Sequence, residues 1–190
     1  MLTRRLVLTS SLAGMLGAPL LRSARAQAVL TEDGLYKQPW FIESLLELAD
    51  DLGDAAKAGK RFAIMWELRG CPYCKETHLV NFAKPEIEGY VKERFDILQL
   101  NIIGSREVID FDGERLPEKQ LAAKYGVRFT PTFQFFAERP DGLKVLKPRA
   151  REVARAQGYL EPRHFLAMFR FVAERAYEKG SLRDYLKANS

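Results

Sequence analysis

Two cysteines separated by two residues are the part of this 190-residue chain best suited to chemistry. Cys71 and Cys74 follow an apolar run at 62–66 that is typical of a buried strand. A helical pattern after the run places the first sulfur at a helix N-terminus, where free N–H groups and the helix dipole favour a thiolate. We therefore interpret Cys71 as the attacking thiol and Cys74 as the resolving thiol of a redox pair.

Other uses of a Cys-x-x-Cys motif fit the sequence less well. A zinc site needs two further ligands, and His78 and His164 are the only histidines, with no spacing that brings His164 to the motif. Covalent haem attachment needs a histidine directly after the second cysteine, where this chain has Lys75. We expect neither a metal nor a cofactor. A non-enzymatic metal- or thiol-binding module is the alternative to an enzyme.

Residues 1–28 have the features of an export signal peptide. Arg4 and Arg5 precede an interrupted apolar stretch, and small residues predict cleavage near residues 26–28. The arginine pair resembles a twin-arginine signal, with an ordinary secretory signal or an uncleaved anchor as alternatives. We therefore expect a periplasmic protein in which residues 29–190 form a single domain.

Composition narrows the classes of partner. The chain is 47% hydrophobic and 29% charged, which is typical of a globular domain with a core. Four of its 30 basic residues and none of its 25 acidic residues lie in the signal, so the rest is nearly neutral. This charge balance gives no support for nucleic-acid binding. Because both cysteines belong to the motif, we expect no structural disulfide, and we expect a monomer.

The apolar spacing predicts alternating helices and strands. In the first half we expect a helix from 39 to 58, a central strand at 61–67, and a helix that runs from the motif to about 81, is interrupted at Pro85 and continues over 86–94. Next we expect a strand at 95–103, a hairpin turning at Asp112-Gly113 and a short helix at 118–125. The remaining elements are a strand at 127–136, a longer antiparallel partner at 143–157, a helix at 161–179 and a last turn or two of helix at 181–188. This order favours an α/β protein with a central mixed sheet and helices on both faces.

The motif and the later strands resemble the thioredoxin fold. Cys71-Pro72-Tyr73-Cys74 is similar to the active-site motif of that family, and residues 120–132 are similar to the segment that leads into its cis-proline loop. The resemblance implies a cis peptide bond before Pro131, opposite the cysteines. It also implies that Pro72 and an exposed Tyr73 contact the substrate, while the backbone of Thr130 pairs with an incoming peptide.

Residues 29–190 also resemble the SoxW-like periplasmic thioredoxins. The similar segments are residues 70–75, 106–114 and 158–160. This resemblance implies a protein-disulfide reductase that acts on periplasmic proteins with disulfides, in the oxidation of sulfur compounds, and that receives electrons from a membrane dithiol donor. A thiol oxidase or isomerase of the same fold is the alternative.

One position departs from the family pattern. Thioredoxins place a buried acid six residues before the first cysteine, where this chain has Met65. Glu67 follows two residues later and, by strand alternation, points to the same face. We hypothesise that Glu67 assists proton transfer at Cys74. The alternative is a solvated charge at the end of the strand.

Overall fold

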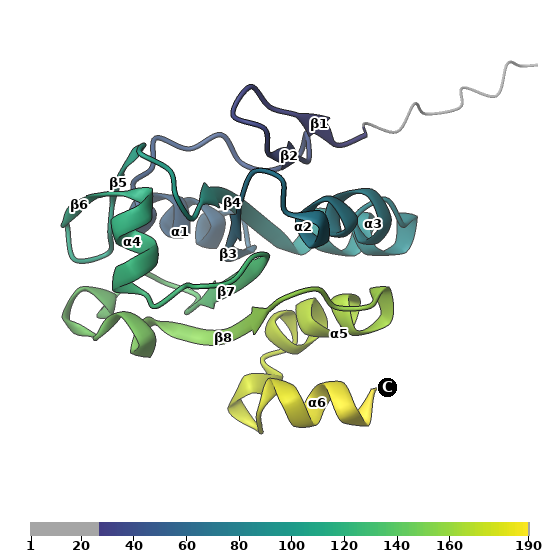
Figure 1. Ribbon diagram of the computed structural model, residues 1–190. Helices are drawn as coiled ribbons and strands as arrows, with labels where there is room; N and C mark the ends of the chain where they lie inside the picture. Colours follow the sequence, from purple (N-terminus) through teal and green to yellow (C-terminus); the bar gives the residue numbers. More distant parts are fainter. Residues whose placement is uncertain (1–26, 190) are drawn as a thin grey trace, which may run out of the picture.

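The computed structural model describes residues 27–189, which are organised around one four-stranded sheet with the strand order β4-β3-β7-β8. Strand β3 (Arg61–Glu67) runs parallel to β4 (Phe95–Asn101) and antiparallel to β7 (Thr132–Phe136). Strand β8 (Glu152–Gln157) pairs antiparallel with β7 at the edge (Figure 1). The predicted mixed sheet and the central place of β3 are confirmed. The predicted export signal lies almost wholly outside the described residues.

Alternation along the strands divides the core between the two faces of the sheet. Ala63 and Met65 of β3 face one cluster, and Phe62, Ile64 and Trp66 face the other. Trp66, in the apolar run predicted to be a buried strand, is fully buried. Since β3 has neighbours on both sides and helices on both faces, its near-continuous apolar sequence is what burial requires.

Helices cover both faces of the sheet. The face that contains Trp66 packs against α1 (Leu48–Lys57), α4 (Glu118–Lys124) and the hairpin formed by β5 (Glu107–Ile109) and β6 (Arg115–Pro117). The other face packs against α2 (Pro72–Glu76), the π-helical turn η1 (Thr77–Asn81), α3 (Pro85–Arg94) and α5 (Pro162–Ala173). The predicted hairpin, the helix that opens at the motif and its interruption at Pro85 are therefore confirmed.

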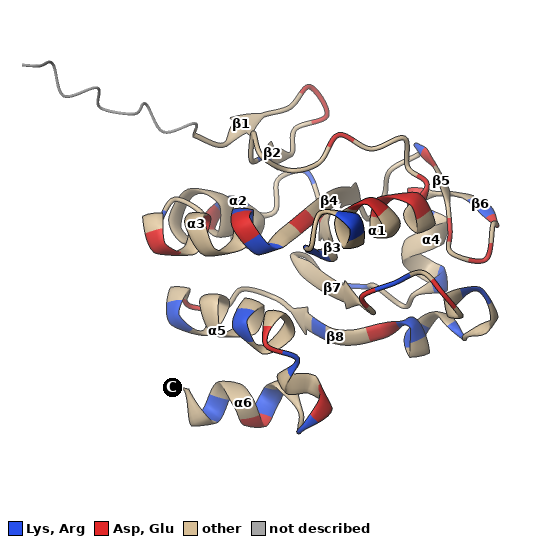
Figure 2. Cartoon of the chain, turned by 180° about the vertical axis from the view of Figure 1, so that it is seen from behind, with Lys and Arg blue, Asp and Glu red and all other residues tan. Residues whose placement is uncertain are grey.

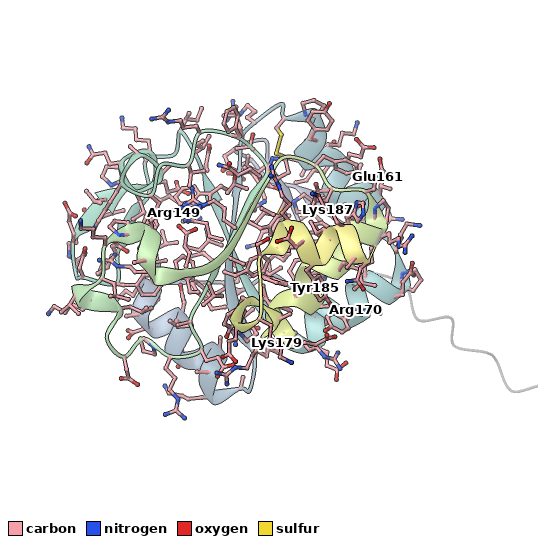
Figure 3. All side chains as sticks on the ribbon, turned by 90° about the horizontal axis from the view of Figure 1, so that it is seen from below. Arg149, Glu161, Arg170, Lys179, Tyr185 and Lys187 are labelled. Carbon is pink, nitrogen blue, oxygen red and sulfur yellow. A yellow bond between two sulfur atoms is a disulfide. The ribbon has the colours of Figure 1, made fainter. Side chains whose placement is uncertain are left out.

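The last helix, α6 (Leu182–Ala188), lies on the outer side of α5. Ser181 caps it by accepting a hydrogen bond from the backbone of Asp184. The Tyr185 ring packs against Phe171 of α5, with 5.2 Å between ring centroids. Figure 3 shows Tyr185 where the two helices meet. In the part of the chain that the structure describes, no helix is long and apolar enough to cross a bilayer.

The first predicted helix is wrong over its first half. Helix α1 begins only at Leu48, and residues 39–47 follow an irregular path along the sheet. Leu46 has a positive φ of 64°, and the N–H of Ile42 bonds to the carbonyl of Ile97. Phe41 is buried by this path, so its helix-like spacing reflects packing of an extended segment against the core.

The C-terminal third also differs from the predictions. Only β8 is a strand in the segment 143–157, because two 3₁₀ turns, η2 (Leu143–Val145) and η3 (Pro148–Arg151), precede it. The predicted helix at 161–179 ends at Ala173, since Arg175 adopts a left-handed φ of 55° before a final turn, η4 (Ala176–Glu178). Two strands are shorter than predicted: the strand predicted at 95–103 ends at Asn101, and the strand predicted at 127–136 begins only at Thr132.

The segment before residue 39, for which the apolar spacing predicts no helix or strand, forms a small ribbon. Strands β1 (Val29–Leu30) and β2 (Tyr36–Lys37) pair antiparallel. The ribbon lies beside the loop that joins β3 to α2 (Figure 1). It therefore forms part of the surroundings of the two cysteines.

Candidate active site

The two cysteines lie where β3 ends and α2 begins. Cys71 is the N-cap of α2, and its Sγ accepts a hydrogen bond of 3.1 Å from the N–H of Cys74. Pro72 occupies the first helical position, where a missing N–H costs nothing. Cys71 and Cys74 form a disulfide with 5.3 Å between their Cα atoms. Cys71 is half-buried while Cys74 is buried, so an incoming partner reaches Cys71 more easily.

The loop before β7 faces this disulfide. The Thr130–Pro131 peptide bond is cis, as the resemblance implies. The Sγ of Cys71 lies 3.6 Å from the carbonyl oxygen of Thr130. Because β7 is the antiparallel neighbour of β3, the sheet brings the two loops together from distant parts of the sequence.

Aromatic side chains flank the disulfide. Tyr73 is 55% exposed, as predicted, and stacks on Tyr159 with 6.0 Å between ring centroids. The Tyr159 hydroxyl donates to the side-chain oxygen of Asn81. Phe129, next to Thr130, is also exposed. The sequence marks residues 158–160 only through a family resemblance and gives no sign that Tyr159 contacts Tyr73.

Glu67 lies at the end of β3 and is fully buried. Its Oε1 accepts a hydrogen bond of 2.6 Å from Nε2 of His78, and its Oε2 accepts one from the side-chain amide of Gln99. The alternative that Glu67 is a solvated charge is therefore wrong. A buried carboxylate with hydrogen bonds to both oxygens is instead part of the internal structure of the site.

His78 connects Glu67 to the N-terminal segment. Its ring is buried, and its Nδ1 lies 3.3 Å from the side-chain nitrogen of Gln38, which also donates to the His78 carbonyl oxygen. With Gln38 donating to Nδ1, the proton of the neutral ring is on Nε2 and points at Glu67. His78 is therefore both a buried residue of the core and a hydrogen-bond partner of the Glu67 carboxylate.

A cavity of about 360 Å³ brings these parts together. Glu67, Cys71 and Cys74 all line it, together with residues of the β1–β2 ribbon. Glu67 and Cys74 thus adjoin the same space. Within residues 27–189, no group of three or more His, Cys, Asp or Glu side chains is arranged to hold a metal ion.

One family model matches this chain, and two solved structures are similar to it. The family model described as a thioredoxin-like domain matches residues 48–173. A thioredoxin-fold protein from Helicobacter pylori superposes with a TM-score of 0.51 and 22% sequence identity, over 74% of this chain and 93% of that chain. A thioredoxin from Thermus thermophilus gives a TM-score of 0.47 and 25% identity, over 68% of this chain and 88% of that chain. No curated protein matches the chain.

Proposed function

Because the chain belongs to the thioredoxin-like domain family, we propose that it is an exported protein-disulfide reductase that uses Cys71 and Cys74 as its dithiol. The observation that carries this proposal is the position of Cys71, a half-buried sulfur at the N-cap of α2 bonded to a buried partner sulfur. A backbone N–H directed at Sγ stabilises the negative charge that the sulfur carries as an attacking or leaving group.

The reaction has two exchange steps. In the reduced protein, the Cys71 thiolate attacks one sulfur of a partner disulfide, which forms a mixed disulfide and releases the other partner sulfur as a thiolate. Cys74 then loses its proton and attacks the sulfur of Cys71, which releases the reduced partner and closes the Cys71–Cys74 disulfide. We assign the proton from Cys74 to Glu67, which adjoins the same cavity.

The partner protein docks on the side of the disulfide that carries the Thr130–Pro131 loop. The backbone of Thr130 lies next to the Cys71 sulfur, where an extended peptide can pair with it. Tyr73, stacked on Tyr159, provides an exposed aromatic surface beside Pro72. These contacts support the use of Pro72, Tyr73, Thr130 and Pro131 in substrate binding.

The cellular setting is proposed from the sequence. Residues 1–28 support export to the periplasm, and the confinement of both cysteines to the motif suits an oxidising compartment. The resemblance to SoxW-like thioredoxins supports a role in the oxidation of sulfur compounds, with a membrane dithiol donor that restores the reduced state. We propose that the protein acts there as a monomer.

Reduction of insulin by the purified protein tests the proposed activity. The native protein, recycled by a dithiol, is expected to accelerate insulin reduction, and Cys71→Ser is expected to abolish the acceleration because no attacking sulfur remains. Failure of the native protein to accelerate the reaction would contradict the proposal. Cys74→Ser, which cannot resolve the mixed disulfide, is expected to retain periplasmic partners covalently, and mass spectrometry then identifies them.

A further inference from the structure

The cavity beside the disulfide has the size of a site for a small molecule. Its volume is about 360 Å³, and ligand pockets in proteins commonly measure about 300–1,000 Å³. One wall is the active-site segment, including Cys71, Cys74 and Lys75, and the other is the ribbon with Leu30, Gly34 and Tyr36. Both cysteine residues therefore border a space that a small ligand can fill.

This cavity overlaps the surface proposed for protein partners only in part. Pro72 and Cys71 belong to both, whereas Tyr73, Thr130 and Pro131, on the protein-docking side of Cys71, do not line the cavity. The disulfide therefore has a second approach. A folded partner is too large for a recess of this volume, whereas a small disulfide fits.

The ribbon that forms the outer wall is held in place by hydrogen bonds and close packing. The Nε of Arg69 donates to the carbonyl of Asp33 at 2.7 Å, and the side-chain amide of Gln99 donates to the carbonyl of Tyr36. Gly34 has a φ of +80°, and a Cβ placed there would lie 2.9 Å from Cγ of Arg69. The wall is therefore a fixed part of the fold.

The accessible charge of the cavity is positive. Its lining contains two charged side chains, Glu67 and Lys75. Glu67 is fully buried, and both of its oxygens accept hydrogen bonds. Lys75 is exposed and forms no ion pair within residues 27–189, so its ammonium group is available to a ligand. A carboxylate is the small organic group that suits it.

We propose that this cavity binds small disulfides with carboxylate end groups and presents them to Cys71, an inference that rests on the proposed dithiol activity. The Cys71 thiolate attacks one sulfur of the ligand, its S–S bond breaks, and one half leaves as a thiolate. Cys74 gives up its proton and displaces the second half from Cys71. One dithiol is oxidised to the Cys71–Cys74 disulfide and one ligand disulfide is reduced to two thiols.

Single-turnover kinetics with three symmetrical disulfides tests the inference. The pre-reduced protein is mixed with dithiodipropionate, hydroxyethyl disulfide or cystamine, whose end groups are carboxylate, hydroxyl and ammonium. The remaining protein thiols are measured by alkylation and mass spectrometry, so no recycling reductant is required. Each rate is divided by the rate of the same disulfide with free glutathione, which removes differences in the pKa of the leaving thiol, and all comparisons below use these normalised rates. The carboxylate disulfide is then expected to react about fivefold faster than cystamine, the gain that one exposed ion pair provides.

Two variants test whether the preference for the carboxylate disulfide arises in the cavity. Lys75→Gln is expected to bring the ratio of carboxylate to ammonium rates close to one, whereas Lys144→Gln, an exposed lysine outside the cavity, leaves it unchanged. Leu30→Trp, which fills the space, is expected to slow all three small disulfides more than it slows insulin. Leu45→Trp, at a 92% exposed position outside the cavity, serves as its control.

The outcomes separate this inference from the proposed activity. Equal rates with all three disulfides, or an unchanged ratio in Lys75→Gln, would overturn the small-ligand site while insulin reduction still supports the reductase. A preference for cystamine would overturn it as well. Loss of reactivity toward both insulin and the small disulfides would instead contradict the proposed function itself.

Discussion

The chemistry of this protein depends on a few contacts around two sulfurs and one buried carboxylate. Cys71 receives an N–H hydrogen bond at the start of a helix, which supports its charge. Glu67 lies behind the pair, buried and held by His78 and Gln99. A fixed acid beside a buried thiol can move a proton without first reorganising solvent.

Replacing Glu67 tests its proposed part in proton transfer. Glu67→Gln keeps the size of the side chain but cannot exchange a proton, so we expect insulin reduction to slow by at least about tenfold, since general acid–base groups contribute about 10²–10⁴-fold. The pH–rate profile is expected to lose one ionisation. An unchanged profile would exclude Glu67 from proton transfer.

His78→Gln provides the matched comparison, because His78 contacts Glu67 but is not assigned a proton transfer of its own. We expect it to slow the reaction less than Glu67→Gln and to retain the number of ionisations in the pH–rate profile. The rate at which iodoacetamide alkylates Cys71 is measured in both variants, to confirm that the attacking thiol is intact.

At the scale of elements, one carboxylate joins the end of β4 to the start of α4. Glu118, in the first turn of α4, is buried and accepts hydrogen bonds from the N–H groups of Asn101 and Arg106. The Arg106 guanidinium also donates to it, at 2.6 Å. This arrangement leaves no room at Gly104, where a Cβ would lie 1.9 Å from Oε2 of Glu118.

Gly104→Ala is therefore expected to destabilise the protein. The added methyl group must displace the Glu118 carboxylate, and disturbing buried hydrogen bonds costs about 1–3 kcal/mol. Gly89→Ala is the control, because Gly89 lies within α3 with no heavy atom within 4 Å of the added carbon. It is expected to stabilise the protein by about 0.5–1 kcal/mol. Urea unfolding measures both, and a destabilised Gly89→Ala or an unaffected Gly104→Ala would contradict this account.

At the scale of the whole molecule, a buried ionic cluster fastens the segment at 143–151 to the rest of the domain. Arg151 donates to Asp110 and Asp112 at 2.8 Å each and to the Tyr125 hydroxyl at 2.9 Å. Lys124 of α4 reaches the same carboxylates. Figure 2 shows the mixed signs of charge where α4, the hairpin and β8 come together. The cluster explains why these residues turn inward and do not extend β8.

Removing the Arg151 side chain is expected to lower the free energy of unfolding more than removing any exposed charged side chain does. Arg151→Met removes one of the two cations that pair with the buried carboxylate of Asp110 and leaves Lys124, and breaking a buried ion pair costs about 3–5 kcal/mol. Arg149→Met, which removes an exposed partner of Glu152, is expected to cost less than about 1 kcal/mol. Equal losses in urea unfolding would contradict the assigned role of the cluster.

The same cluster gives a pH dependence with a defined sign. Burial raises the pKa of Asp112, but hydrogen bonds from Arg151 and Lys124 outweigh it and hold that pKa below its usual range. The folded state therefore favours the charged carboxylate, and this stabilisation is present above about pH 4 and lost as the pH falls further. In Arg151→Met, the acid-dependent part of the unfolding free energy is expected to shrink.

Sequence patterns were sufficient to predict the elements that depend on interactions between neighbouring residues. The apolar run of β3 and the Cys-x-x-Cys motif after it indicate a strand, a helix start and a redox pair, because burial and helix capping act on neighbouring residues. The hairpin near Gly113 and the short helix α4 follow for the same reason. The family resemblance added the cis bond before Pro131, which local patterns do not indicate.

Only the tertiary structure decided where distant residues meet. Whether Glu67 is solvated or buried depends on His78, Gln99 and Gln38, which come from three other parts of the chain. The helix wrongly extended over 39–47 and the strand wrongly extended over 143–151 have the same cause. The apolar and charged residues of these two segments contact residues that are distant in the sequence. Their spacing therefore reflects those contacts and does not indicate the local backbone conformation. The cavity beside the disulfide exists only because the β1–β2 ribbon folds against the motif, a contact between segments distant in the sequence that no local pattern encodes.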